Sequence, residues 1–179
     1  MEKNKLEIKP YQRAVYTVIL FIAIIWCAGI LIAPLWANEQ GFKKDSSEFL
    51  YTFYSASCHQ DDARSLHISG FELGVCSRCT AIYFSFLLAS ILYPFIRKLN
   101  NLILPPLWIL LAGAGLVAVD AGLDIFGIVP NTFISREITG AIIGFILPFY
   151  IIPGSIMLVN EFFTPSKITP QKEKDAKTG

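Results

Sequence analysis

The chain of 179 residues is 54% hydrophobic and 16% charged, with a mean hydropathy of +0.52. Soluble domains carry about 25% charged residues, so this composition excludes an ordinary water-soluble domain and indicates several membrane-spanning helices embedded in a lipid bilayer. The net charge of +1 also argues against a nucleic-acid-binding protein, because such proteins concentrate basic residues on one face.

Four segments are apolar enough to cross a bilayer, which requires roughly 20 largely apolar residues. They are residues 14–36, 76–96, 102–126 and 138–159. Basic residues precede the first segment, as they precede a signal peptide. Its apolar run, however, is longer than the roughly 7–15 residues of such a leader, so we predict a retained helix. The fold expected is an all-α membrane protein, a bundle of four transmembrane helices.

The bundle divides the chain into three parts. Residues 1–13 form an N-terminal tail, residues 14–160 the transmembrane domain, and residues 161–179 a polar tail expected to be disordered. The two tails and the connection between the second and third helices carry ten Lys and Arg residues, against five on the other side. The positive-inside rule then predicts a multi-pass protein of the cell membrane with both termini in the cytoplasm.

An outer insertion, residues 37–75, separates the first two predicted helices. Asp45 and Glu48 have the spacing of a capping box, and apolar residues recur on one helical stripe after them. The pattern predicts a short amphipathic helix over residues 47–57, lying at the membrane interface. This helix would deliver Cys58 and His59 close to the membrane.

Potential metal ligands and reactive thiols gather within residues 55–84. This stretch holds three of the four cysteines and both histidines: Cys58, His59, His67, Cys76 and Cys79. Cys76 and Cys79 are three residues apart, so their sulfurs share one face of a helix. The positive N-terminal end of that helix, with Arg78 beside it, favours the thiolate form.

Three interpretations of this stretch remain open. Cys58, Cys76 and Cys79 with one histidine would form a Cys₃His zinc site. Alternatively, an outward-facing dithiol on a four-helix bundle is similar to the architecture of quinone-linked thiol-disulfide oxidoreductases. A non-enzymatic scaffold with a disulfide-stapled loop is the third interpretation. Cys27, in the middle of the first helix, is expected only to fill space.

Four charged residues are further candidates, with possible catalytic roles. Asp120 and Asp124 are four residues apart and share a helix face, unless the third helix ends near residue 119. Carboxylates at this depth require a partner or water, and Arg136 is one candidate partner. Arg64 pairs either with a neighbouring aspartate or with an anionic headgroup or phosphate. All four converge on the face that carries the cysteines: Arg64 belongs to the same insertion, and the other three lie two crossings further along the chain, an even number that returns it to that face.

The fourth helix carries a packing signal of its own. Gly140 and Gly144 have the small-xxx-small spacing that lets membrane helices approach closely. A four-helix bundle of this kind is also compatible with a homodimer. Neither the substrate, nor the metal, nor whether the protein is an enzyme follows from these patterns.

Several of these motifs resemble the signature of a known family. The motifs are Cys-His-Gln at 58–60, Arg-Ser at 64–65 and Cys-Ser-Arg-Cys-Thr at 76–80, followed by Ile-Tyr at 82–83. They resemble a family of small predicted prokaryotic membrane proteins with a domain of unknown function, over roughly residues 50–150. The resemblance implies a membrane protein with a shared polar centre and supplies no reaction. The corresponding positions are Cys58, His59, Gln60, Arg64, Ser65, Cys76, Arg78, Cys79, Thr80 and Tyr83, with Asp120, Arg136 and Gly140 matched less closely. Ala81 departs from the pattern, where a glycine is expected.

Overall fold

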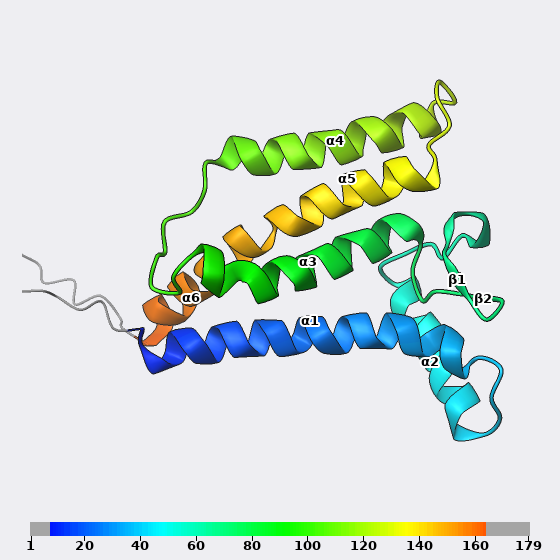
Figure 1. Ribbon diagram of the computed structural model, residues 1–179, viewed down its shortest axis with the longest axis horizontal. Coiled ribbons are helices and arrows are strands. Elements are labelled where there is room, and N and C mark those ends of the chain that lie inside the picture. The colour runs from blue at the N-terminus through cyan, green and yellow to red at the C-terminus, as the bar shows by residue number, and fades with distance from the viewer. Residues whose placement is uncertain (1–7, 164–179) are drawn as a thin grey trace, which may run out of the picture.

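The computed structural model describes residues 8–163 and is built almost wholly of α-helices (Figure 1). The elements are α1 (Pro10–Trp36), α2 (Phe42–Ser55), the 3₁₀ turn η1 (Asp62–Arg64), β1 (His67–Ile68), β2 (Phe71–Glu72), α3 (Ser77–Ile96), α4 (Leu107–Ile125), α5 (Phe133–Ile146) and α6 (Pro148–Phe163). The two short strands pair antiparallel, with His67 opposite Glu72.

Within residues 8–163, four helical spans are long and apolar enough to cross a membrane, as the sequence predicts. They are Pro10–Trp36, Ser77–Ile96, Leu107–Ile125 and Phe133–Phe162. The expected start of the third span at residue 102 is wrong by five residues. Pro105 and Pro106 lie before α4 and disfavour helical backbone at the residues that precede them.

The fourth span is interrupted near its middle. α5 ends at Ile146 and α6 begins at Pro148. Proline has no backbone N–H to continue the hydrogen-bond ladder, and its ring crowds the preceding turn. The two halves therefore meet at Leu147, whose N–H still donates to the Ile143 carbonyl at 3.1 Å.

The long helices lie side by side in the order α4, α5, α3, α1 (Figure 1). α6 continues from α5 and packs against α1 and α3, whereas α4 packs mainly on α5. This order makes α3 a central element, because it contacts α1, α5 and α6. α3 is also the helix that carries two of the three clustered cysteines.

Close packing of α3 on α5 depends on the glycine pair expected from the sequence. A Cβ atom on Gly144 would lie 2.3 Å from the Ile82 carbonyl oxygen, and one on Gly140 would lie 2.6 Å from the Arg78 carbonyl oxygen. Both distances are far below van der Waals contact. The prediction of a small-residue contact is thus confirmed, and it places α5 directly beside the cysteine-bearing turn of α3.

The amphipathic helix of the insertion is present and longer than expected. α2 begins at Phe42 instead of residue 47, directly after Gly41, whose φ of +63° suits glycine. Asp45 therefore lies in the first turn and is not the cap. The helix is tied to α1 by the Tyr54 hydroxyl, which donates to the Trp26 carbonyl at 2.8 Å, while Phe49 is exposed on the outer side.

The two ends of the bundle differ in content. One end, called here the cysteine end, carries α2, the β1–β2 hairpin, the start of α3, the end of α4 and the start of α5 (Figure 1). The other, called here the terminal end, carries the start of α1 and the end of α6. Both expected tails lie outside the described residues, apart from Ile8 to Arg13 and Glu161 to Phe163. Helix α1 already begins at Pro10.

Candidate metal centre

The first turn of α3 positions two of the cysteines. Cys76 is the N-cap residue, with extended backbone. Its carbonyl accepts from the Thr80 N–H at 2.9 Å and from the Thr80 hydroxyl at 3.1 Å. Cys79 follows three residues later, so its side chain lies on the same face of the turn. Thr80, which belongs to the motif, therefore fixes the turn that presents both sulfurs.

The third cysteine arrives from the segment after α2. The Cys58 N–H donates to the Tyr54 carbonyl at 3.0 Å. Gln60 adopts a positive φ of 49°, and its side-chain amide donates to the carbonyls of Tyr51 at 2.8 Å and Gly74 at 2.7 Å. Gln60 thus links the end of α2 to the segment that enters α3, and brings Cys58 to the start of that helix.

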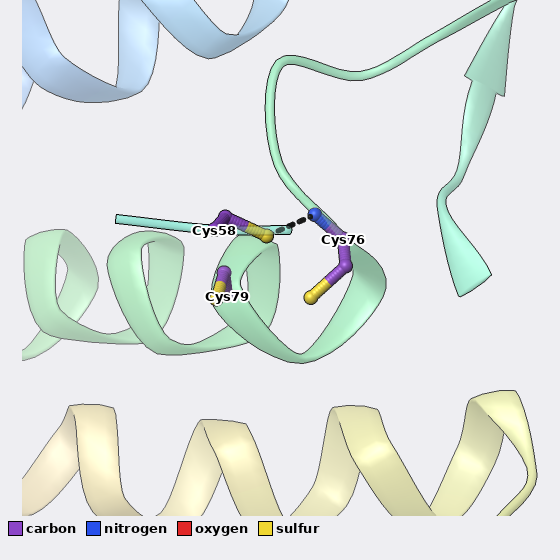
Figure 2. A group of neighbouring side chains, drawn as sticks. All are labelled: Cys58, Cys76 and Cys79. Carbon is purple, nitrogen blue, oxygen red and sulfur yellow. Dashed lines mark hydrogen bonds between the residues drawn. The ribbon is translucent and has the colours of Figure 1, made fainter. Parts of the chain in front are cut away.

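The three sulfur atoms all lie within 4.8 Å of one another. Figure 2 shows Cys58 reaching the first turn of α3, where Cys76 and Cys79 lie, and marks the bond from the Cys76 N–H to the Cys58 sulfur, which measures 3.2 Å. Cys58 is buried, with 6% of its surface exposed. All four cysteines of the chain are free thiols in this structure.

Hydrogen bonding favours the thiolate form of Cys58. Its pKa is lowered well below the ordinary value, first by the hydrogen bond from the Cys76 thiol and then by that from the Cys79 thiol. Burial opposes this effect, and the backbone N–H groups of Cys76 and Gln60 add to the lowering. Donors that converge on one sulfur stabilise negative charge there.

Neither histidine belongs to this group of sulfurs. His59 is exposed, although it is adjacent to Cys58 in the chain. His67 lies on β1, and its Nε2 atom is 2.8 Å from a carboxylate oxygen of Asp62. Within residues 8–163 the structure therefore assembles three cysteines, without the histidine that a Cys₃His site requires.

The charged candidates form a network beside the cysteines. Arg78, between the two α3 cysteines, makes a short ion pair with Asp120 of α4. Asp124 faces two arginines, with Arg64 at 3.5 Å and Arg136 at 3.6 Å. Because α4 runs to Ile125, both aspartates lie on helical backbone, and the alternative in which the helix ends near residue 119 is wrong.

Asn131 is part of this network and was not identified from the sequence. Its backbone N–H donates to Asp124 at 3.1 Å, and its side-chain oxygen accepts from the Arg136 Nε at 2.5 Å. Its place in the Pro-Asn-Thr segment before α5 indicates only a turn. Cys27 is buried in α1, and its thiol donates to the Tyr83 carbonyl at 3.4 Å.

Comparison with known proteins identifies the family of the chain. Residues 58–150 match the family described as "Predicted membrane protein (DUF2085)". The chain is also 38% identical over 141 residues to the uncharacterized protein MJ1492 of Methanocaldococcus jannaschii, covering 77% of this chain and 90% of that protein. No solved structure matches the chain. The chain therefore belongs to this family of membrane proteins.

Proposed function

We propose that this protein is an integral membrane protein that holds one zinc-type ion between the sulfurs of Cys58, Cys76 and Cys79. The observation that carries the proposal is the convergence of three sulfurs from two separate segments within 4.8 Å. Thiolates bound to one tetrahedral zinc lie roughly 3.7–3.9 Å apart, given a Zn–S distance of about 2.3 Å. Small side-chain adjustments would bring the sulfurs to that spacing.

The surroundings of the sulfurs suit a structural or catalytic ion. Gln60 and Thr80 fix the two segments through their hydrogen bonds, and such supporting contacts orient metal ligands in proteins. Ile30 and Val75, both with no exposed surface, belong to the apolar cluster that surrounds Cys58. This burial shields Cys58 from bulk water, whereas Cys76 and Cys79 stay partly exposed.

Three protein ligands leave one tetrahedral position for water or another exogenous group. That arrangement is typical of catalytic zinc, whereas structural zinc is usually closed by four protein ligands. His59 remains able to approach as a fourth ligand or as a base, because it is exposed and adjacent to Cys58. The Lys and Arg distribution favours the extracytoplasmic face for this site.

A thiol-disulfide oxidoreductase is the second candidate. An apolar cavity of about 500 Å³ opens between α1, α3 and the interruption of the fourth span, and Trp26, Ser57 and Tyr83 line it. Tyr83 also packs against the apolar cluster that contains Cys58. A cavity of this kind beside thiols suits a membrane quinone, which would accept the two electrons released when two thiols become a disulfide.

Elemental analysis of the purified protein tests the proposal. We expect about one zinc per chain, lost in each of Cys58→Ser, Cys76→Ser and Cys79→Ser and retained in the matched variant Cys27→Ser. Retention in His59→Ala and His67→Ala would confirm that three cysteines suffice. Replacement of zinc by cobalt would add sulfur-to-metal charge-transfer absorption that the same three serine variants lose.

Two results would contradict the metal site. The first is metal-free protein that takes up no zinc after reduction and dialysis against it. The second is equal zinc content in the wild type and the three serine variants. Metal-free protein in which added quinone drives the loss of two alkylatable thiols would establish the redox function instead.

A further inference from the structure

We propose that a second site at the cysteine end binds a phosphate group between Arg64 and Arg136. The site is a cavity of about 200 Å³ lined by Ala63, Arg64, Asp124, Asn131, Phe133 and Arg136. It joins η1, the end of α4 and the start of α5. The charged side chains on its wall are two arginines and one aspartate.

The proposal depends mainly on the burial of Arg136 and on how its guanidinium group is paired. This arginine is 93% buried, yet the one side-chain hydrogen bond that its guanidinium makes to residues 8–163 runs from Nε to the neutral side-chain oxygen of Asn131, at 2.5 Å. Its terminal Nη2 atom lies 3.6 Å from Asp124. Charge-assisted hydrogen bonds to carboxylates are about 2.7–2.9 Å long. The buried guanidinium is therefore incompletely paired on the side that faces the cavity.

Asp124 is shared between Arg64 and Arg136, so its single negative charge does not fully neutralise either arginine. Its Oδ2 atom is the contact for both Arg136 and Arg64, at 3.6 and 3.5 Å, while its Oδ1 atom accepts from the Asn131 N–H at 3.1 Å. Arg64 also pairs through Nε with Asp61 at 3.0 Å, but both of these side chains are about half exposed, where water screens the attraction. The wall of the cavity consequently keeps a net positive charge.

Phosphate is the anion that this wall suits. Two guanidinium groups present planar pairs of N–H donors, which match the oxygens of a phosphate. The cavity lies where α4 ends and α5 begins, and the same part of the chain carries exposed apolar side chains at Ile128, Val129 and Ile134. These side chains would enter the bilayer rim, where lipid phosphates lie. A phospholipid headgroup and a soluble phosphate ester share this chemistry.

Ligand-dependent stability in detergent tests the site. Inorganic phosphate and dihexanoyl phosphatidic acid are titrated separately at constant ionic strength, and the dissociation constant is obtained from the rise in melting temperature. We expect saturable stabilisation of the wild type. Arg64→Gln should weaken binding by about tenfold or more, since it removes charge-assisted hydrogen bonds. Lys43→Gln, which removes an exposed charge of α2 at the same end, should bind as the wild type does.

The outcomes distinguish the two phosphate sources and separate this site from the metal centre. Stabilisation by both ligands would show that a soluble phosphate group enters, and stabilisation by the lipid alone would assign a headgroup. Arg136→Lys keeps the positive charge but loses the planar pairs of N–H donors, so this variant should also bind phosphate more weakly. No saturable effect of either ligand, or equal affinities in Arg64→Gln and Lys43→Gln, would overturn the proposal. Zinc content should stay unchanged in Arg64→Gln, so the metal site can fail while this one stands.

Discussion

The two ends of the bundle are stabilised in different ways. At the terminal end, Tyr93, Leu99, Ile152 and Ile156 form an apolar core, and Arg97 donates to the neighbouring loop carbonyl of Ile103. At the cysteine end, by contrast, arginines pair with carboxylates of other elements, and thiols from separate segments meet.

This contrast concerns where charged side chains are concentrated. Charged residues near or within a bilayer are costly unless they are paired or face water, and they commonly mark functional sites. The terminal end combines its apolar core with hydrogen bonds, such as that from the Tyr11 hydroxyl to Asn160 at 3.1 Å. The ion pairs of the cysteine end join different elements of the fold. Substitutions at each end can measure how much that end depends on its own kind of contact.

The largest expected effect comes from the contact that joins the cysteine-bearing helix to α5. Gly144→Val should lower the free energy of unfolding by about 3 kcal/mol, because its Cβ would meet the Ile82 carbonyl oxygen at 2.3 Å. Gly115→Val on α4 is the matched control, since nothing lies within 4 Å of its Cβ position. Titration with sodium dodecyl sulfate in mixed micelles measures both. Equal losses would show that α3 and α5 are not closely packed.

The next effect tests the ion pair at the cysteine end. Asp120→Asn leaves Arg78, which is 17% exposed, without its carboxylate. Breaking a fully buried pair costs about 3–5 kcal/mol, so we expect about 2 kcal/mol for this partly exposed one. Glu39→Gln, which breaks the half-exposed pair with Lys43, should cost less than about 0.5 kcal/mol. A double variant with Arg78→Gln should recover part of the loss, and the absence of any recovery would argue against direct pairing.

Two buried tyrosines, one at each end, allow the contribution of a single hydroxyl group to stability to be compared. Tyr54, at the cysteine end, donates to the Trp26 carbonyl at 2.8 Å, so Tyr54→Phe should cost about 1 kcal/mol. Tyr93, at the terminal end, has no hydrogen-bond partner for its hydroxyl among residues 8–163, so Tyr93→Phe should be neutral or stabilising. Reversal of this order in the unfolding free energies would contradict the hydrogen-bond assignments.

The smallest expected effect concerns pH. The pKa of Glu72, on β2, is raised chiefly by burial, so the folded state favours its protonated form. The protonated Glu72 carboxyl therefore contributes its full stability below the ordinary pKa of glutamate. This contribution is lost as the pH rises through the raised pKa that Glu72 has in the folded protein. Glu72→Gln should stabilise the protein at pH 7 and have less effect at pH 4. A stabilisation that is the same at both pH values would show that burial does not perturb this carboxyl.

Much of this architecture follows from hydropathy and helix count. Four apolar runs give four crossings, and the two crossings between Cys58 and Asp120 return the chain to the same end of the bundle. The spacing of Gly140 and Gly144 indicates their contact because small side chains leave room for a neighbouring helix. These inferences depend on local composition and on whether the number of membrane crossings is even or odd. Neither requires knowledge of side-chain geometry.

The parts that sequence reasoning missed depend on backbone direction within short segments. His67 is turned towards Asp62 by a two-residue strand pairing, whose register no periodicity reveals. Asn131 becomes a partner of Arg136 only because the loop before α5 folds back on α4. The interruption at Leu147 is invisible to hydropathy, since residues on both sides are equally apolar.

The ion pair between Arg78 and Asp120 also constrains how the protein is made. Asp120 lies five residues before the end of α4, roughly 7.5 Å inside it at 1.5 Å per residue. A lone aspartate at the bilayer centre costs about 2.5–3.5 kcal/mol during translocon insertion, and less near the rim. The connection between α3 and α4 spans only residues 97–106, so both helices leave the ribosome nearly together. We therefore expect Arg78 and Asp120 to meet soon after both helices have entered the membrane, with α5 then packing between α3 and α4.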